Sequence, residues 1–306
     1  MEARVQRRVQ RYGWDLAAHD YERLWQAQLG PAQAEMLARV GLQAGERVVD
    51  VACGTGLVSF AAAEAVGPSG RVLGVDISGA MVDAAQRRAE ALGVGHAAFA
   101  RMDAEALDLG DAGFDVALCG LGLMYVPDPA RAMRELCRVV RPGGRVGLAV
   151  WGERARCGWA GVFPIVDAEV ASDVCPLFFG LGSGDALARL CGDVGLTEIA
   201  LRRIATTLVY DDGDEACDAA FVGGPVALAW SRFDAATRER VRARYLASIS
   251  PWRQADGGYR IPGEFVVVVA RAEGAGGTDS ADSANAADTP PSPRSGRLIG
   301  ALGAAV

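Results

Sequence analysis

Three aspartates follow or end short apolar segments of the chain, where carboxylates could hold a ligand. Asp50 lies in VVDVACGTG, Asp76 in GVDIS and Asp103 in ARMDAEAL. If these segments are parallel strands, their carboxyl ends meet at one edge of a sheet, which is where open α/β sheets bind ligands. A single strand-end carboxylate is commonly just solvated, but three on one crevice predict a nucleotide-like ligand.

The loop after the first segment is almost bare of side chains. Gly54 and Gly56 allow its backbone to bend sharply and to approach a ligand closely. A dinucleotide site has the pattern G-x-G-x-x-G, whereas this loop has Ala52 at its start and Ser59 at the last position. Asp50 would repel a pyrophosphate and attract a cationic amine or sulfonium. The pattern therefore favours S-adenosylmethionine over NAD, with an NAD-dependent oxidoreductase as the alternative.

The segments that must position these residues alternate between strand-like and helix-like patterns. The helix-like pattern of 128–140 begins with Asp128 as a cap and Pro129 in the first turn. We therefore expect an α/β fold: a Rossmann-like, seven-stranded, mostly parallel sheet with helices on both faces. The expected strands are Arg47–Val51, Arg71–Asp76, Ala97–Arg101, Phe114–Cys119, Arg145–Trp151, Glu198–Val209 and Glu264–Ala270.

These residues resemble the class I S-adenosylmethionine-dependent methyltransferases. The resemblance is carried by VVDVACGTG, GVDIS, MDAE, the long stretch FDVALCGLGLMYVPDPARAMRELCRVVRPGGR and the closing strand. It covers residues 47–151 closely and the later strands loosely. The small-molecule methyltransferases of ubiquinone and menaquinone biosynthesis are the branch that it resembles.

The resemblance implies roles for the residues of the first loop. Asp50 would hold the methionine amino group through water or loop amides, and Gly54 and Gly56 would flank the methionine moiety. Ala52 stands where the family usually has its first glycine, a change that alanine tolerates if its φ is negative.

The resemblance also implies which residues hold the rest of the cofactor. Asp76 would bind the ribose hydroxyls and Ile77 would pack on the adenine. The adenine edge would meet Asp103 and Ala104. The floor beneath the sulfonium would consist of Cys119 and Gly120.

Methyl transfer requires alignment of donor and acceptor, and it requires a general base only when the acceptor must lose a proton. His19, near Trp14, Tyr21 and Trp25, is the candidate base, although a lone histidine beside aromatic residues is more often structural. Tyr125, after the fourth strand, could position an acceptor through its hydroxyl or simply pack in a half-buried site.

Composition narrows the class of protein further. The net charge is −7, and all 31 cationic side chains are Arg, which excludes mechanisms that use a P-loop or Schiff-base lysine. The acidic balance disfavours nucleic acid as a partner. Seven scattered cysteines and two histidines disfavour a metal site. With no apolar run long enough to span a membrane, we expect a cytoplasmic enzyme of small-molecule metabolism.

The expected organisation has three parts. Residues 1–40 would form an N-terminal helical cap, with helices over 14–29 and 31–40. Residues 41–271 would form the methyltransferase domain, with lid elements at about 152–182 and 211–262. The lids are rich in aromatic residues, which suits a small aromatic or apolar acceptor methylated at O, N or C. Residues 272–306 have the composition of a disordered tail.

Two further possibilities remain open at this stage. The protein could bind the cofactor without transferring a methyl group, and it could form a homodimer.

Overall fold

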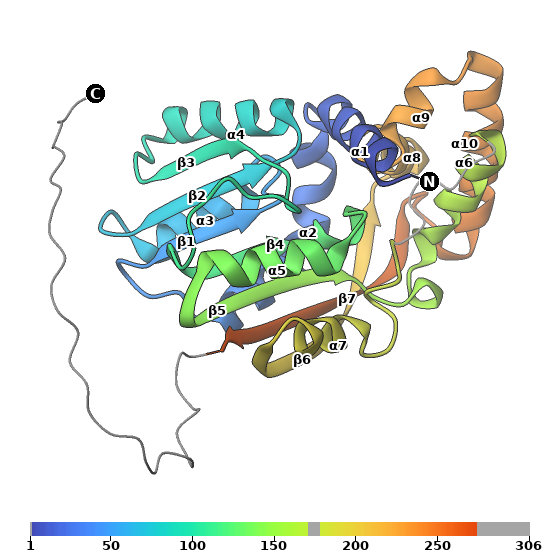
Figure 1. The fold of residues 1–306 in the computed structure, drawn as a ribbon. Helices are drawn as coiled ribbons and strands as arrows, with labels where there is room; N and C mark the ends of the chain where they lie inside the picture. The colour runs from blue at the N-terminus through green and yellow to red at the C-terminus, as the bar shows by residue number, and fades with distance from the viewer. Residues whose placement is uncertain (1, 171–177, 274–306) are drawn as a thin grey trace, which may run out of the picture. The chain divides into compact units, whose positions relative to one another are not determined.

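In the computed structural model, residues 2–170 and 178–273 are described, and they form one seven-stranded sheet. The strand order is β3-β2-β1-β4-β5-β7-β6, and β7 runs antiparallel to both of its neighbours (Figure 1). This arrangement confirms the expected Rossmann-like sheet. In chain order the strands are β1 (Arg47–Val51), β2 (Arg71–Asp76), β3 (Ala97–Arg101), β4 (Phe114–Gly120), β5 (Val140–Trp151), β6 (Leu196–Tyr210) and β7 (Tyr259–Ala272).

The first three strands have the bounds that the sequence predicts. In β1 every residue after Arg47 is buried, as expected for a central parallel strand that is covered on both faces. The chain order reverses between β1 and β4, since β2 and β3 extend to one side and β5 to the other. The carboxyl ends of β1 and β4 therefore border the crevice at which doubly wound sheets bind ligands.

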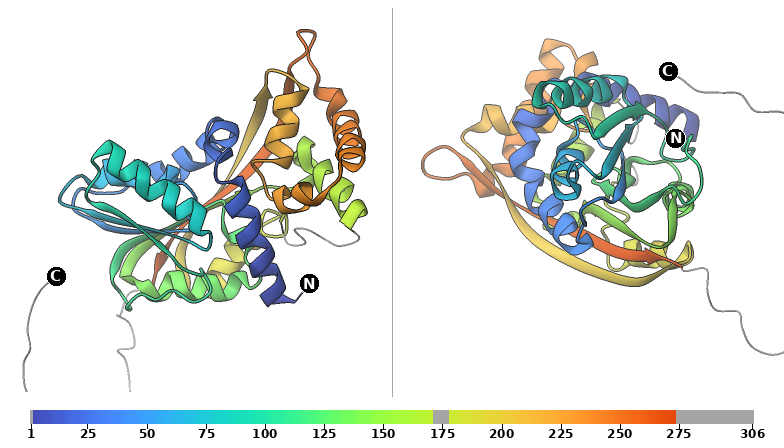
Figure 2. Two further views of the ribbon diagram at one scale, coloured as in Figure 1. Left: turned by 90° about the horizontal axis from the view of Figure 1, so that it is seen from above. Right: turned by 90° about the vertical axis from the view of Figure 1, so that its left-hand side faces the viewer.

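Helices cover both faces of the sheet (Figures 1 and 2). Right-handed crossovers place α3 and α4 on the face that α2 also covers, whereas α5 and α7 lie on the other face. The α-helices are α1 (Ala3–Ala17), α2 (Tyr21–Val40), α3 (Leu57–Val66), α4 (Gly79–Leu92), α5 (Pro129–Val139), α6 (Val162–Val170), α7 (Ala186–Asp193), α8 (Gly213–Phe221), α9 (Ala227–Arg232) and α10 (Ala235–Ile249).

Four short 3-10 helices complete the elements: η1 (Leu123–Tyr125), η2 (Arg154–Arg156), η3 (Gly158–Gly161) and η4 (Ser250–Trp252). Helices α6, α8, α9 and α10 gather beside the long extension of β6 and β7, beyond the point where β5 ends (Figure 1). This group contains much of the predicted lid region.

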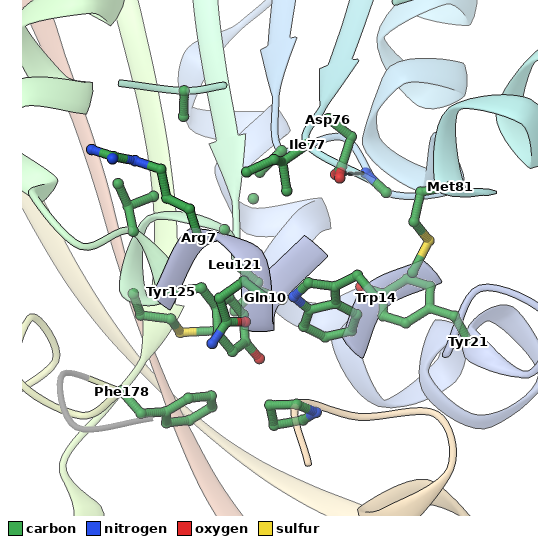
Figure 3. A pocket seen from close by; sticks show the side chains of 18 of the residues that line it. Arg7, Gln10, Trp14, Tyr21, Asp76, Ile77, Met81, Leu121, Tyr125 and Phe178 are labelled. Carbon is green, nitrogen blue, oxygen red and sulfur yellow. Dashed lines mark hydrogen bonds between the residues drawn. The ribbon is translucent and has the colours of Figure 1, made fainter. Parts of the chain in front are cut away.

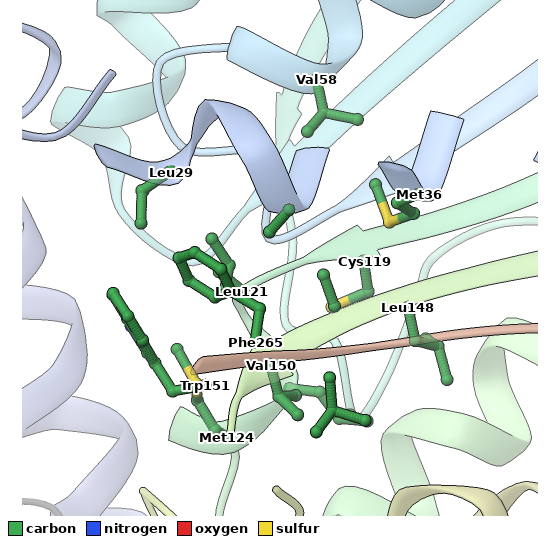
Figure 4. Close-up of a cluster of buried hydrophobic side chains, with 14 of the residues drawn as sticks. Leu29, Met36, Val58, Cys119, Leu121, Met124, Leu148, Val150, Trp151 and Phe265 are labelled. Atoms are coloured by element: carbon green, nitrogen blue, oxygen red, sulfur yellow. The ribbon is translucent and has the colours of Figure 1, made fainter. Parts of the chain in front are cut away.

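The core lies where α2 and α3 pack against the central strands. Met36 of α2 and Val58 of α3 lie close to Cys119 of β4 and Leu148 of β5, and all four side chains are buried (Figure 4). Helix α2 is therefore part of the main hydrophobic core. Residues 1–274 accordingly form one compact unit, without a boundary between units at residue 40.

The N-terminal helices differ from the prediction. Pro31 lies inside α2 instead of beginning a helix, and the break falls at residues 18–20. A proline in a helix interior removes one backbone hydrogen bond. Here the burial of Leu29 and Ala32, on either side of Pro31, keeps the helix continuous. The arginine-rich segment near the terminus belongs to α1.

Later elements agree more closely with their patterns. Helix α5 begins after Asp128, whose carboxylate accepts a hydrogen bond from the Arg131 N–H, and α10 begins after Asp234 in the same way. Residues 171–177 of the first predicted lid and residues 274–306 of the predicted tail lie outside the described residues. In the described part of the chain, no helix combines the length and apolar character needed to cross a membrane.

Candidate functional site

A cavity lies at the carboxyl ends of the parallel strands, with α1 and α2 forming part of its wall. Two regions of its lining differ in chemistry (Figure 3). The aspartate end, beyond β2 and β3, consists of Asp76, Ile77, Met102, Asp103 and Ala104. The aromatic end, beyond β4 and β5, includes Trp25, Tyr125, Trp151, Trp159 and Phe178.

Asp76 is held rigidly at the aspartate end. One carboxylate oxygen accepts a hydrogen bond from the Gly54 N–H and the other accepts from the Ser78 N–H, both at 2.9 Å. Burial raises the pKa of Asp76, although these backbone hydrogen bonds oppose the shift. Each carboxylate oxygen keeps a second lone pair. The side chain can therefore accept two further hydrogen bonds, as a ribose diol requires.

Asp50 lies behind the loop and not on the cavity wall. It is 1% exposed, and Ser59 donates a hydrogen bond of 2.6 Å to its Oδ2, while Oδ1 has no hydrogen-bond partner. Burial raises the pKa of Asp50 to about 7 against the lowering effect of the Ser59 hydrogen bond, and the nearby Asp76 charge raises it further. This buried, half-satisfied carboxyl group would gain from a nearby cation.

The loop itself corrects one expectation. Ala52 has a φ of +58°, so the negative φ at which alanine would be tolerated without strain is not adopted. Gly54 and Gly56 also have positive φ values, of 55° and 88°. Gly54 lines the cavity, whereas Gly56 does not, and a Cβ on Gly56 would lie 2.8 Å from the Phe60 ring.

Helix α1 lies across the cavity and is held by polar contacts near both of its ends. Toward its start, Arg7 forms ion pairs with Asp103, at 3.3 Å, and with the buried Glu105. Toward its end, Asp15 accepts a hydrogen bond of 2.6 Å from the Ser78 hydroxyl. Because Asp103 and Ser78 flank the aspartate end, these contacts hold α1 over the part of the cavity where adenosine is expected.

The aromatic end is a continuous cluster of rings. The Trp159 ring centroid lies 4.8 Å from that of Trp151, 5.5 Å from that of Phe178 and 6.2 Å from that of Trp25. Tyr125 packs edge-on against Phe178, with ring centroids 5.3 Å apart. The five residues that define this end carry no formal charge at neutral pH.

The structure brings some of the predicted site residues together and leaves others away from the cavity. The predicted residues on its wall are Ala52, Gly54, Asp76, Ile77, Asp103, Ala104, Gly120 and Tyr125. Those not on its wall are Asp50, Gly56, Cys119 and His19. Cys119 is buried, which raises its pKa to about 12 and keeps it a neutral thiol.

The position of His19 corrects its assignment as the candidate base. The residue lies in the exposed turn between α1 and α2, outside the cavity lining. The sequence suggested one helix through this position, whereas the chain turns there. A general base must lie within hydrogen-bond reach of the acceptor, directly or through one water. His19 does not meet that requirement in this structure.

Several cavity residues were not predicted. Arg7, Gln10 and Trp14 share one face of α1, at i, i+3 and i+7, and all three line the cavity. This spacing was visible in the sequence, but nothing local shows that the face would cover strands so far along the chain. Tyr21 also lines the cavity. Burial, assisted by the Asp76 and Asp50 charges, raises the pKa of Tyr21, so its phenol stays protonated.

Comparison with known proteins supports the same assignment. Residues 48–144 match the family model described as a methyltransferase domain. The demethylmenaquinone methyltransferase of Geobacillus kaustophilus is 38% identical over 110 residues, which cover 36% of this chain and 47% of that protein. The ubiquinone/menaquinone biosynthesis C-methyltransferase of Francisella philomiragia is 32% identical over 133 residues, or 43% of this chain and 50% of that protein.

This chain thus spans about half the length of these curated relatives. Among solved structures, an N-methyltransferase of Haemonchus contortus, solved with phosphomonomethylethanolamine and S-adenosylhomocysteine, superposes with a TM-score of 0.54 at 15% identity. The superposition covers 85% of this chain and 58% of that one, and it supports the fold. The chain therefore contains a class I S-adenosylmethionine-dependent methyltransferase domain that resembles those of the menaquinone and ubiquinone methyltransferases.

Proposed function

We propose that this protein transfers a methyl group from S-adenosylmethionine to a small, uncharged aromatic or apolar acceptor. The observation that carries the proposal is the division of one cavity into two chemically different ends. Two carboxylates and a nearly bare loop lie at the aspartate end, and a cluster of aromatic rings lies at the other.

The residues present fit this cofactor. The oriented Asp76 carboxylate has lone pairs available for the ribose hydroxyls, and Ile77 and Ala104 supply apolar contacts for the adenine. The buried Oδ1 of Asp50 has no hydrogen-bond partner. A cationic amino group held near the loop would stabilise the ionised form of that carboxyl group.

The cofactor supplies an electrophilic methyl group on a sulfonium. The protein's contribution is to align the acceptor with it and to exclude water, and such positioning is worth about 7 to 11 kcal/mol. Gln10 and Trp14 of α1 cover the middle of the cavity between Asp76 and Tyr125 (Figure 3). The rings of the aromatic end would hold a flat acceptor against the loop.

The cavity lining also limits how a proton could be removed from the acceptor. Its carboxylates, Asp76 and Asp103, belong to the aspartate end. Tyr21 stays protonated, so it can donate a hydrogen bond but is a poor base. The site therefore suits an acceptor that attacks without a strong base, and Tyr125 is the residue that we propose positions it.

The names of the curated relatives agree with an apolar ring acceptor, because demethylmenaquinone is named for one of them. The matched segment, however, contains the cofactor-binding strands and ends before the aromatic residues beyond β5. The acceptor class is therefore argued here from the aromatic end of the cavity itself.

Calorimetry with S-adenosylhomocysteine and with NADH tests the cofactor, and transfer of a labelled methyl group to aromatic acceptors tests the reaction. We expect S-adenosylhomocysteine to bind and NADH not to bind. Asp76→Ala should weaken the binding of S-adenosylhomocysteine at least about tenfold, because two charge-assisted hydrogen bonds are lost. Asp83→Ala, in an exposed position on α4, is the matched control. An unchanged dissociation constant for Asp76→Ala would place the ribose elsewhere.

A further inference from the structure

Two tryptophans of the aromatic end have buried indole N–H groups without a hydrogen-bond partner. Trp25 of α2 is 6% exposed and Trp159 of η3 is 3% exposed. The Nε1 atom of each is fully buried and makes no hydrogen bond in the structure. Both residues line the cavity. A buried donor without a partner costs about 1–3 kcal/mol, so two in one cavity wall require an explanation.

The two indoles belong to one compact wall. Trp25 and Trp159 have ring centroids 6.2 Å apart at an interplanar angle of 70°, and Trp151 packs against both rings. They come from α2 and η3, elements that are far apart in the sequence. A single ligand that enters this wall can therefore reach both indoles with little movement of the surrounding core.

The surroundings limit the charge of such a ligand. Arg7, Asp76 and Asp103 are the charged side chains among the residues that line the cavity, and all three lie at or beside the aspartate end. A phosphate, carboxylate or ammonium group at the aromatic end would be desolvated without a counter-ion, which is strongly unfavourable. A neutral carbonyl, ether or phenol oxygen has no such cost, and it can accept hydrogen bonds from indole N–H groups.

We propose that the methyl acceptor is a neutral planar ring whose oxygen accepts hydrogen bonds from the indole N–H groups of Trp25 and Trp159. The inference rests on the proposed function, because it names the class of acceptor for the same cavity. Both indoles act as specificity-determining residues: they favour an oxygenated ring over the bare hydrocarbon of the same shape. One carbonyl oxygen has two lone pairs and can accept from both donors.

The test compares two ligands that have nearly the same skeleton. Binding of 1-indanone and of indane, which lacks the carbonyl oxygen, is measured by calorimetry on the full chain saturated with S-adenosylhomocysteine. We expect 1-indanone to bind at least about fivefold more tightly, as one or two net hydrogen bonds would provide. Equal affinity for the two ligands would overturn the proposal, because the indole N–H groups would then face the neighbouring ring faces instead of a ligand.

Variants assign the preference to the two residues. Trp25→Phe and Trp159→Phe keep an aromatic ring and remove the N–H, and each should lower the preference for 1-indanone about twofold to fivefold. The double variant should lose the preference. Trp230→Phe is the matched control, since Trp230 stacks on Phe221 outside the cavity lining. A preference that survives in the double variant would also overturn the proposal.

Binding of S-adenosylhomocysteine is measured in every sample. If a variant binds it as the unchanged protein does, the fold and the cofactor site are intact. If the unchanged protein does not bind it, the proposed function fails. If the cofactor product binds and the ketone preference is absent, only the assignment of the acceptor class fails.

Discussion

Ala52 and Gly122 share one small space at the loop after β1. Ala52 has a left-handed backbone conformation, which costs a non-glycine residue about 1–2 kcal/mol. Its side chain fills the volume that a side chain at position 122 would need, since a Cβ on Gly122 would lie 2.3 Å from the Ala52 Cβ. A substitution at one of these positions therefore has an effect that depends on the other.

The stability of variants at this pair should be strongly non-additive. Gly122→Ala alone should lower the free energy of unfolding by about 1–3 kcal/mol through overpacking. Ala52→Gly alone should be neutral or slightly stabilising, because it relieves the positive φ. In the double variant most of the Gly122→Ala cost should disappear. Denaturant unfolding of the four proteins gives the coupling energy, and additive effects would contradict this account.

The raised pKa of Asp50 predicts a pH dependence. The shift is from an ordinary 3.8 to about 7. Between these values the folded protein keeps a proton that the unfolded chain has released, so this group's contribution to the free energy of unfolding falls as the pH rises. A cationic ligand favours the ionised form. We therefore expect S-adenosylhomocysteine to bind about fivefold to tenfold more tightly at pH 7.5 than at pH 6.

Calorimetry across this pH range checks the prediction, and Asp50→Asn should flatten the profile. Burial also raises the pKa of Asp76, so titration of that group has the same sign and the Asp50 variant is needed to separate the two. Asp83→Asn, at an exposed position on α4, should leave the profile unchanged. If Asp50→Asn keeps the full pH dependence, another group is responsible.

Among the elements, α1 is the one whose contacts bear most directly on cofactor exchange. Its inner face lines the cavity, and its polar contacts reach the loop after β3 and the start of α4. Glu105 is central to the first of these contacts. It is 2% exposed, pairs with Arg7 and accepts a hydrogen bond of 2.8 Å from the Asp128 N–H at the start of α5. Glu105 therefore joins α1 to the body of the domain.

Loosening this contact should speed the release of cofactor product. Glu105→Gln keeps a partner for the Asp128 N–H and removes the charge that holds Arg7. We expect the dissociation rate of S-adenosylhomocysteine to rise about threefold to tenfold, on the order of 1 kcal/mol for one half-buried ion pair. Stopped-flow displacement measures it. Glu35→Gln, which breaks a comparable Arg–Glu pair on α2 outside the cavity lining, should change nothing; equal rates in all three proteins would contradict this role for α1.

At the scale of the whole molecule, one compact unit contains the entire cavity. The lining residues extend from Arg7 to Pro225, and all of them belong to the unit of residues 1–274. Deletion of residues 275–306 should therefore leave the dissociation constant of S-adenosylhomocysteine unchanged within about twofold. Deletion of residues 2–17 should instead weaken binding at least about tenfold, because it removes the helix that covers the aspartate end. Calorimetry on both truncated chains decides between these outcomes.

Much of the fold was predictable because its strongest signals are local. The apolar segment before each strand-end aspartate, and the capping aspartates before α5 and α10, act within a few residues of where they occur. Pro31 was misleading for the same reason. Its local effect is to end helices, whereas the burial of its neighbours in the core outweighs that effect.

The sequence by itself determined the order of the strands and the acidic residues at their ends, because hydrophobic periodicity and turn chemistry are short-range properties. Only the tertiary structure decided that α1 covers the cavity, that His19 lies outside it and that Trp25 and Trp159 meet in one wall. Those facts depend on packing between segments up to about half the chain apart, and no local pattern encodes which surfaces will meet.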